Sequence, residues 1–204
     1  MTQSHPDWFT GIASNTFNAV LEQYAGLPNQ HFLQVGAWTG DASVWLMENV
    51  LTHKTSTLTD VDVWDLDIPP NYISTAGYNL TEIEKEYDQK IQPYGDKVIK
   101  VKSTSHAWLA QTHDKQYDFI YIDGDHAAKA VLVDGLLAWD HLKIGGLMAF
   151  DDYLWEHQSD MNPGIGIDLF LKLYSEKLEI LKMYFGKDYF VRMDYQLWIK
   201  KISA

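Results

Sequence analysis

The sequence predicts a three-layer α/β sandwich, in which a mostly parallel sheet lies between two layers of helices. Short apolar segments alternate with amphipathic helical patterns over most of the chain, and two strand-like segments, 178–185 and 189–199, close it. Strands and helices that alternate in this way form parallel units, because each helix carries the chain back across the sheet. The 204 residues suffice for one sizeable core, so we expect a single domain, 1–204.

Composition and charge exclude several classes of protein. The formal net charge of −12 opposes binding to nucleic acid backbones and to anionic membranes. The chain has no cysteine, which excludes disulfides and a thiolate metal site. No apolar run approaches the ~20 residues of a membrane span, and the N-terminus lacks the pattern of a secretory signal. We therefore expect a cytoplasmic protein without nucleic-acid or membrane partners, and its aromatic N-terminal segment leaves a homo-oligomer open.

The first third of the chain predicts a helical extension, a strand and a glycine loop. Apolar spacing over residues 8–24 indicates one or two helices in an N-terminal extension, 1–28, and residues 31–35 form the first strand. Gly36 and Gly40 then enclose a turn that leads into a helical pattern at 41–51. Such a turn presents backbone N–H groups and a helix N-terminus to a ligand, although glycine there can also serve packing alone.

The second strand, 57–63, ends among three acids. An acid at this strand tip commonly binds ribose hydroxyls in nucleotide-binding folds, and Asp62 is the better placed of Asp60 and Asp62. The alternative is that these acids are solvated loop residues. Residues 65–95 follow as a lid-like insertion, with an irregular proline-containing part and a helix at 81–91, although an ordinary long loop would have the same composition.

Two further strands, 117–123 and 147–150, end in charged residues. Asp123, Asp125 and His126 follow the first, and Asp151 and Asp152 follow the second. Neighbouring parallel strands place such tips at one crevice, where carboxylates can hold a hard divalent cation, most simply Mg²⁺, with Mn²⁺ or Ca²⁺ as alternatives. We therefore predict a metal site of Asp123, Asp151 and Asp152, with His126 as general base or extra ligand. The alternative is that Asp151 and Asp152 bond local amides, and Asp125 fits a turn or cap role better than a ligand role.

Five motifs in chain order together resemble one family. They are FLQVGAWTG, LTDVDVW, VKSTSHAWL, FIYIDGDH and LKIGGLMAFDDYLW. They resemble the class I S-adenosylmethionine-dependent methyltransferases, and most of all the metal-dependent small-molecule O-methyltransferases of the catechol, caffeoyl-coenzyme A and macrocin types. The resemblance covers about residues 32–153. It implies a Rossmann-like sheet of seven strands in the order 3-2-1-4-5-7-6, with strand 7 antiparallel.

The resemblance also implies roles for individual residues. The first motif would surround the methionine part of the cofactor, Asp62 would bind its ribose, Asp123 would lie near its amino group and a metal ion, and the third motif would line its adenine. The implied cofactor-binding residues are Gln34, Gly36, Ala37, Trp38, Gly40, Asp62, Ser105, His106 and Asp123. Two positions depart from the family pattern. Gln34 replaces an acid, and His126 replaces a catalytic lysine, which an imidazole with a pKa near ~6.5 can do as a neutral base.

These observations predict an S-adenosylmethionine-dependent methyltransferase that methylates a hydroxyl of a small molecule with the help of a divalent cation. Asp123 and His126 would be its catalytic residues. The aromatic residues Trp38, Trp64, Tyr153 and Trp155 either wall the acceptor pocket or simply pack. Two other classes stay open. One is a non-catalytic or metal-independent relative that only binds the cofactor. The other is an NAD-dependent oxidoreductase, which would require the G-x-G-x-x-G motif that this chain lacks.

Overall fold

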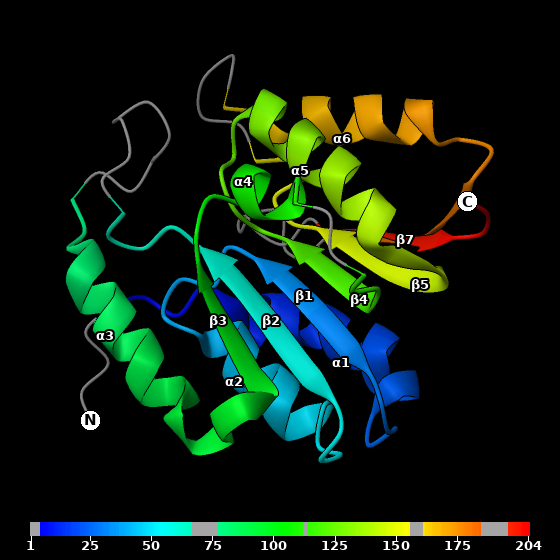
Figure 1. Ribbon diagram of the computed structural model, residues 1–204. Helices are drawn as coiled ribbons and strands as arrows, with labels where there is room; N and C mark the ends of the chain where they lie inside the picture. The colour runs from blue at the N-terminus through cyan, green and yellow to red at the C-terminus, as the bar shows by residue number, and fades with distance from the viewer. Residues whose placement is uncertain (1–4, 67–76, 112–113, 156–160, 185–195) are drawn as a thin grey trace.

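A seven-stranded sheet runs through the middle of the protein, in the order β3-β2-β1-β4-β5-β7-β6. The computed structural model describes residues 5–66, 77–111, 114–155, 161–184 and 196–204 (Figure 1). Strands β1 to β5 are parallel, and β7 is antiparallel to both β5 and β6, which confirms the order that the sequence resemblance implied. The strands are β1 His31–Val35, β2 Thr57–Asp62, β3 Val98–Lys102, β4 Tyr117–Ile122, β5 Leu142–Phe150, β6 Leu178–Tyr184 and β7 Gln196–Lys201.

Helices cover both faces of the sheet (Figure 1). Helices α4, α5 and α6 lie on one face, whereas α1, α2 and α3 lie on the other. Within the described stretches, none of the helices is both long and apolar enough to cross a bilayer. The helices are α1 Ser14–Leu21, α2 Asp41–Asn49, α3 Leu80–Ile91, α4 Ser105–Leu109, α5 Ala128–His141 and α6 Pro163–Leu173, and shorter helical segments are Phe9–Ala13, Glu22–Tyr24 and Gln92–Lys97.

The strands alternate between two apolar cores, one on each face. In β4, Ile120 and Ile122 point toward α5 and α6, whereas Phe119 and Tyr121 point toward α1 and α2. This is the two-residue period of a strand that is buried on both sides. Where a strand carries polar residues at alternate positions, the same two-residue period places all of them on one face of the sheet. Polar residues placed in this way belong to the candidate active site.

Several boundaries differ from those predicted. Strand β5 begins at Leu142, not at residue 147, because Gly145 and Gly146 lie inside the strand and not in a turn before it. Gly145 has φ +87°, and the register between β4 and β5 shifts in this region, as glycine at a bulge allows. The sequence pattern predicts a helix over about 167–178, whereas α6 begins at Pro163 and ends at Leu173. Residues 67–76 of the lid-like insertion lie outside the described residues.

Candidate active site

The glycine loop after β1 lies against the tip of β4. Gly36 has φ +84°, and a Cβ added there would be 1.9 Å from the backbone oxygen of Asp123. Only glycine combines this left-handed conformation with such a close approach. Gly40, with φ +85°, precedes the first residue of α2, Asp41. The loop therefore brings backbone N–H groups and the N-terminus of a nine-residue helix to the carboxyl end of the sheet.

Asp62 holds this loop in place. Its Oδ2 accepts hydrogen bonds from the backbone N–H groups of Ala37 and Trp38, at 2.7 and 2.9 Å, and its Oδ1 accepts one from Trp64 at 3.0 Å. These bonds fix Trp38 in a left-handed conformation with φ 48°. Because a carboxylate has about four acceptor positions, these three bonds leave room for one more donor.

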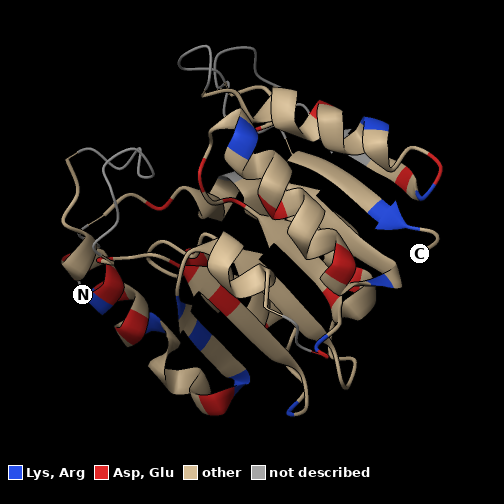
Figure 2. Cartoon of the chain, turned by 45° about the horizontal axis from the view of Figure 1, so that its top comes forward, with Lys and Arg blue, Asp and Glu red and all other residues tan. Residues whose placement is uncertain are grey.

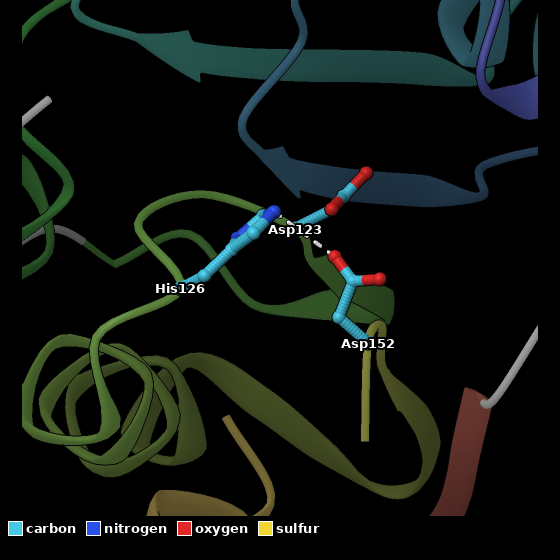
Figure 3. Close-up of side chains that lie close together, drawn as sticks. All are labelled: Asp123, His126 and Asp152. Atoms are coloured by element: carbon cyan, nitrogen blue, oxygen red, sulfur yellow. Dashed lines mark ion pairs between the residues drawn. The ribbon is translucent and has the colours of Figure 1, made fainter. Parts of the chain in front are cut away.

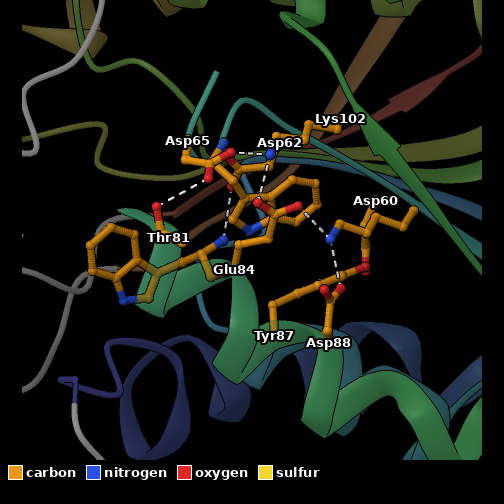
Figure 4. Close-up of polar contacts among 11 residues, drawn as sticks. Asp60, Asp62, Asp65, Thr81, Glu84, Tyr87, Asp88 and Lys102 are labelled. Atoms are coloured by element: carbon orange, nitrogen blue, oxygen red, sulfur yellow. Dashed lines mark hydrogen bonds and ion pairs between the residues drawn. The ribbon is translucent and has the colours of Figure 1, made fainter. Parts of the chain in front are cut away.

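Gln34 and Asp60 form a buried polar pair on β1 and β2, on the face that α2 covers. They are 2% and 0% exposed and are register partners in the parallel ladder. The Gln34 amide donates to the Gly36 carbonyl at 2.8 Å, so it is turned toward the loop backbone. Asp60 Oδ2 accepts a hydrogen bond from Ser43 at 2.7 Å. It accepts another at 2.8 Å from Tyr87, which is labelled with Asp60 in Figure 4. Burial raises the pKa of Asp60 to about 7.

Helix α3 is joined to the edge strand β3 by a charged network. Lys100 contacts Glu84 at 2.7 Å and Asp88 at 2.6 Å, while Lys102 contacts Glu84 at 2.6 Å and also Asp65. The acids of α3 therefore face the lysines of β3 (Figures 2 and 4). Although each exposed pair is worth little alone, the network places α3 against the tip of β2.

The residues predicted to line the adenine follow β3. Thr104 caps α4 by accepting a hydrogen bond from Ala107 N–H at 3.2 Å, and Ser105 is the first helical residue. His106 Nε2 lies 3.3 Å from Oδ1 of Asp134, a buried acid of α5. The contact with Asp134 raises the pKa of His106, because the carboxylate favours the charged imidazole.

Asp123, His126 and Asp152 converge at the tips of β4 and β5 (Figure 3). One ligand atom from each lies within 4.8 Å of the others. His126 Nε2 is 3.0 Å from Asp152 Oδ2. Asp152 has φ 56°, a left-handed conformation that a non-glycine residue adopts at some cost. Two carboxylates and an imidazole so close together are suitable donors for a divalent cation.

The negative charge of this group determines the protonation of its members. Burial and the neighbouring carboxylates of Asp151 and Asp152 raise the pKa of Asp123 well above its usual range. Burial opposes the charged form of His126, but the contact with Asp152 and the nearby acids outweigh it and raise its pKa to about 9. This pKa exceeds the ordinary value of ~6.5 on which the sequence prediction of a neutral base rests, because the fold surrounds the imidazole with the carboxylates of Asp123, Asp151 and Asp152.

Asp151, which precedes Asp152 in the chain, is not part of the group formed by Asp123, His126 and Asp152. Its Oδ2 accepts hydrogen bonds from the hydroxyl of Tyr121 and, at 3.0 Å, from the amide of Gln196. Its Oδ1 accepts one from Asp152 N–H at 2.8 Å. Burial, followed by the charge of Asp152, raises the pKa of Asp151 to about 6. The structure thus brings Asp123 and Asp152 together with His126, and it ties Asp151 to Tyr121 and Gln196, which the sequence analysis did not single out.

The aromatic residues near the strand tips have different surroundings. Trp38 stacks on Trp8, with ring centroids 5.0 Å apart, whereas Trp64 is 1% exposed and packs on Tyr87. Trp155 packs edge-on against His126 at 5.1 Å. The hydroxyl of Tyr153 donates a hydrogen bond to Asp168 at 2.8 Å.

Asp125, at the tip of β4, accepts a hydrogen bond from Ala127 N–H at 2.9 Å, which is the turn role that the sequence predicts for it.

Known proteins share both the sequence family and the fold. Residues 33–153, more than half of the chain, match the family described as methyltransferase domain. An O-methyltransferase from Bacillus cereus, solved with S-adenosylhomocysteine (SAH), superposes with a TM-score of 0.61 at 14% identity, over 98% of this chain and 93% of that chain. An rRNA methylase from Streptococcus thermophilus gives 0.64 at 11% identity, over 94% and 95%. The O-methyltransferase TomG from Streptomyces achromogenes, solved with S-adenosylmethionine, gives 0.60 at 12% identity, over 85% and 74%.

No curated protein sequence matches the chain significantly. At identities this low the structural likeness establishes the fold, whereas the family match covers the glycine loop, Asp62 and both acidic strand tips. No G-x-G-x-x-G motif of an NAD-dependent enzyme is present in the sequence. The chain belongs to the methyltransferase domain family.

Proposed function

We propose that the protein transfers the methyl group of S-adenosylmethionine to a hydroxyl oxygen of a small molecule, with the help of a divalent cation, by preference Mg²⁺. The observation that carries the proposal is the convergence of Asp123, His126 and Asp152 directly beside the glycine loop. A methyl acceptor bound there would face the part of the cofactor that the loop surrounds.

The cofactor would lie across the tips of β1, β2 and β3. The loop from Gly36 to Gly40, with the backbone of Ala37 and Trp38, would surround its methionine part. Asp62 would use its remaining acceptor position for a ribose hydroxyl, and Ser105 and His106 would lie beside the adenine. Gln34 acts indirectly in this proposal, because its amide supports the loop through the Gly36 carbonyl. This accounts for an uncharged side chain at that position.

The donor set fits a cation that keeps open positions for water and substrate, since Mg²⁺ is commonly bound through one or two carboxylates. Asp123 and Asp152 would hold it. When bound, such a cation would lower the pKa of the acceptor hydroxyl and offset the carboxylate charge that otherwise keeps His126 protonated. His126 would then take the hydroxyl proton, and its side chain is 28% exposed, so an acceptor can reach it.

A small acceptor is supported by the net charge of −12, which opposes an RNA backbone, and by the O-methyltransferases among the similar structures. Trp155, edge-on to His126, would supply an apolar wall to the acceptor. A cytoplasmic location, a single domain over 1–204 and a homo-oligomeric state stay predictions from the sequence.

The test is methyl transfer from labelled S-adenosylmethionine to phenols, catechols, sugars and hydroxy acids, and to rRNA, with Mg²⁺ or with a chelator. We expect a product methylated on oxygen, formed from a small acceptor and lost in chelator. Full activity in chelator would refute the role of the cation, and transfer to rRNA alone would refute the small acceptor. Cofactor binding without transfer to any acceptor would favour a non-catalytic relative.

His126→Gln should retain Mn²⁺ binding while kcat falls ~10²-fold or more, and loss of Mn²⁺ binding would make His126 a ligand instead.

A further inference from the structure

A buried chain of polar side chains leads from helix α1 to the proposed cation site. It lies on the α1 face of the sheet and consists of Thr16 on α1, Gln196 on β7, Asp151 after β5 and Tyr121 on β4. Tyr121 and Gln196 are 1% and 2% exposed. Burying polar side chains so deeply costs free energy unless their hydrogen bonds are satisfied. A buried chain of such residues therefore calls for a structural or functional explanation.

The far end of the chain is fixed to the protein core. Gln196 Oε1 accepts hydrogen bonds from the hydroxyl of Thr16 and from the indole N–H of Trp198, the latter at 3.2 Å. The indole N–H of Trp198 can only donate, so its contact identifies the amide oxygen, whereas the Thr16 hydroxyl, which also donates to the Ala13 carbonyl at 2.8 Å, could pair with either end of an amide. The Gln196 NH₂ group is thereby directed at Asp151 Oδ2, 3.0 Å away.

The near end of the chain contacts both acids of the proposed site. The Tyr121 hydroxyl, bonded to Asp151, also lies 3.1 Å from Asp123 Oδ2. The other oxygen of Asp151 accepts a hydrogen bond from Asp152 N–H at 2.8 Å, where the backbone is left-handed. Asp151 is therefore connected to both acids: to Asp123 through the hydroxyl of Tyr121, and to Asp152 through its backbone N–H.

We propose that Asp151, Tyr121 and Gln196 are positioning residues that orient Asp123 and Asp152 toward the cation, and that Asp151 is not itself a cation ligand. This inference rests on the proposed cation site. Asp151 is not among the described residues whose ligand atoms lie within 4.8 Å of one another, which are Asp123, His126 and Asp152, and three of its about four acceptor positions already accept hydrogen bonds from the protein. Residues that support metal ligands in this way typically change metal affinity by ~10–100-fold when they are replaced.

The first experiment measures the dissociation constant of Mn²⁺ in the presence of SAH by electron paramagnetic resonance. Tyr121→Phe, which removes only the hydroxyl, should weaken Mn²⁺ binding ~10–100-fold and leave SAH affinity within about threefold. The matched control is Tyr117→Phe, the same change at the other end of β4, which should leave both affinities unchanged. Gln196→Met removes the bond to Asp151 together with the bonds from Thr16 and Trp198, and it serves as a second variant with the same expectation if Tyr121→Phe fails to fold. Equal Mn²⁺ affinity in the wild type and in both tested variants would overturn the proposal.

The second experiment compares Asp151→Asn with Asp152→Asn. An asparagine at 151 keeps an oxygen that can accept from Tyr121 and Gln196 but loses the acceptor of the Asp152 N–H, so we expect a loss of Mn²⁺ affinity that is smaller than for Asp152→Asn, which changes a proposed ligand itself. An equal loss in the two variants would make Asp151 a ligand and would overturn the inference while the cation site stood. Absence of Mn²⁺ binding to the wild type would overturn both the inference and the cation in the proposed function.

Discussion

Replacing Asp60 by asparagine should change how the stability of the protein depends on pH. Asp60 is fully buried, and within the part of the chain that the structure describes its Oδ1 has no hydrogen-bond partner. Its pKa rises from the ordinary 3.8 to about 7, because burial outweighs the hydrogen bonds from Ser43 and Tyr87 that favour the charged form. Asp60→Asn keeps the shape of the side chain and removes the titrating group.

The raised pKa fixes the direction of the effect. Above about pH 4 the unfolded chain has lost the Asp60 proton, whereas the folded protein keeps it up to about pH 7. The unfolded state then binds fewer protons, so the stability that Asp60 contributes in acid is lost as the pH rises through this window. From pH 5 to pH 7 the loss is two units at ~1.36 kcal/mol each, or about 3 kcal/mol, and the asparagine variant does not suffer it.

Urea unfolding of the wild type and of Asp60→Asn at pH 5 and pH 8 measures this directly. The other acids titrate in both proteins and cancel in the difference between them. We expect the free energy of unfolding of the variant, relative to the wild type, to improve by about 3 kcal/mol between the two pH values. A difference that stays constant within about 0.5 kcal/mol would refute the assignment of a high pKa to Asp60.

Three further predictions concern the surroundings of the cofactor. Gly36→Ala should abolish SAH binding or cost roughly 3 kcal/mol or more of stability, because a Cβ there meets backbone 1.9 Å away, and binding and stability like those of the wild type would contradict this. Asp134→Asn should lower the pKa of His106 toward its ordinary value in an NMR titration, and an unchanged pKa would show that the ion pair does not form in solution. Tyr87→Phe removes a donor to Asp60, so urea unfolding should show about 1–3 kcal/mol less stability at pH 8 and a smaller loss at pH 5, whereas equal losses would exclude this effect.

Most of the fold could be predicted from the sequence, because buried strands and their glycine turns have a local signature. The first strand, His31–Val35, has the predicted bounds, and the order of the sheet agrees with the one implied by the five motifs. Strand β5 was predicted too short, since Gly145 and Gly146 read as a turn, whereas pairing with β4 keeps them in the sheet. Local pattern does not contain such tertiary pairing.

The site was predictable as a place but not as a set of contacts. The acids at the ends of β4 and β5 could be expected to meet, and Asp123 and Asp152 do. The supports of Asp151 come from Tyr121 and Gln196, the latter 45 residues further along the chain, so spacing alone could not reveal them. The sequence signal that points to such supports is a polar residue inside an otherwise apolar strand, because that residue needs a buried hydrogen-bond partner. The pKa of His126 likewise depends on carboxylates that only the fold brings close.

A crystal structure of the protein with SAH and Mn²⁺, with anomalous data collected at the manganese edge, tests the central claim most directly. The account predicts one strong anomalous peak between Asp123 and Asp152, with SAH across the glycine loop and Asp151 still bonded to Tyr121 and Gln196. A structure that contained SAH but no manganese peak at these acids would contradict it.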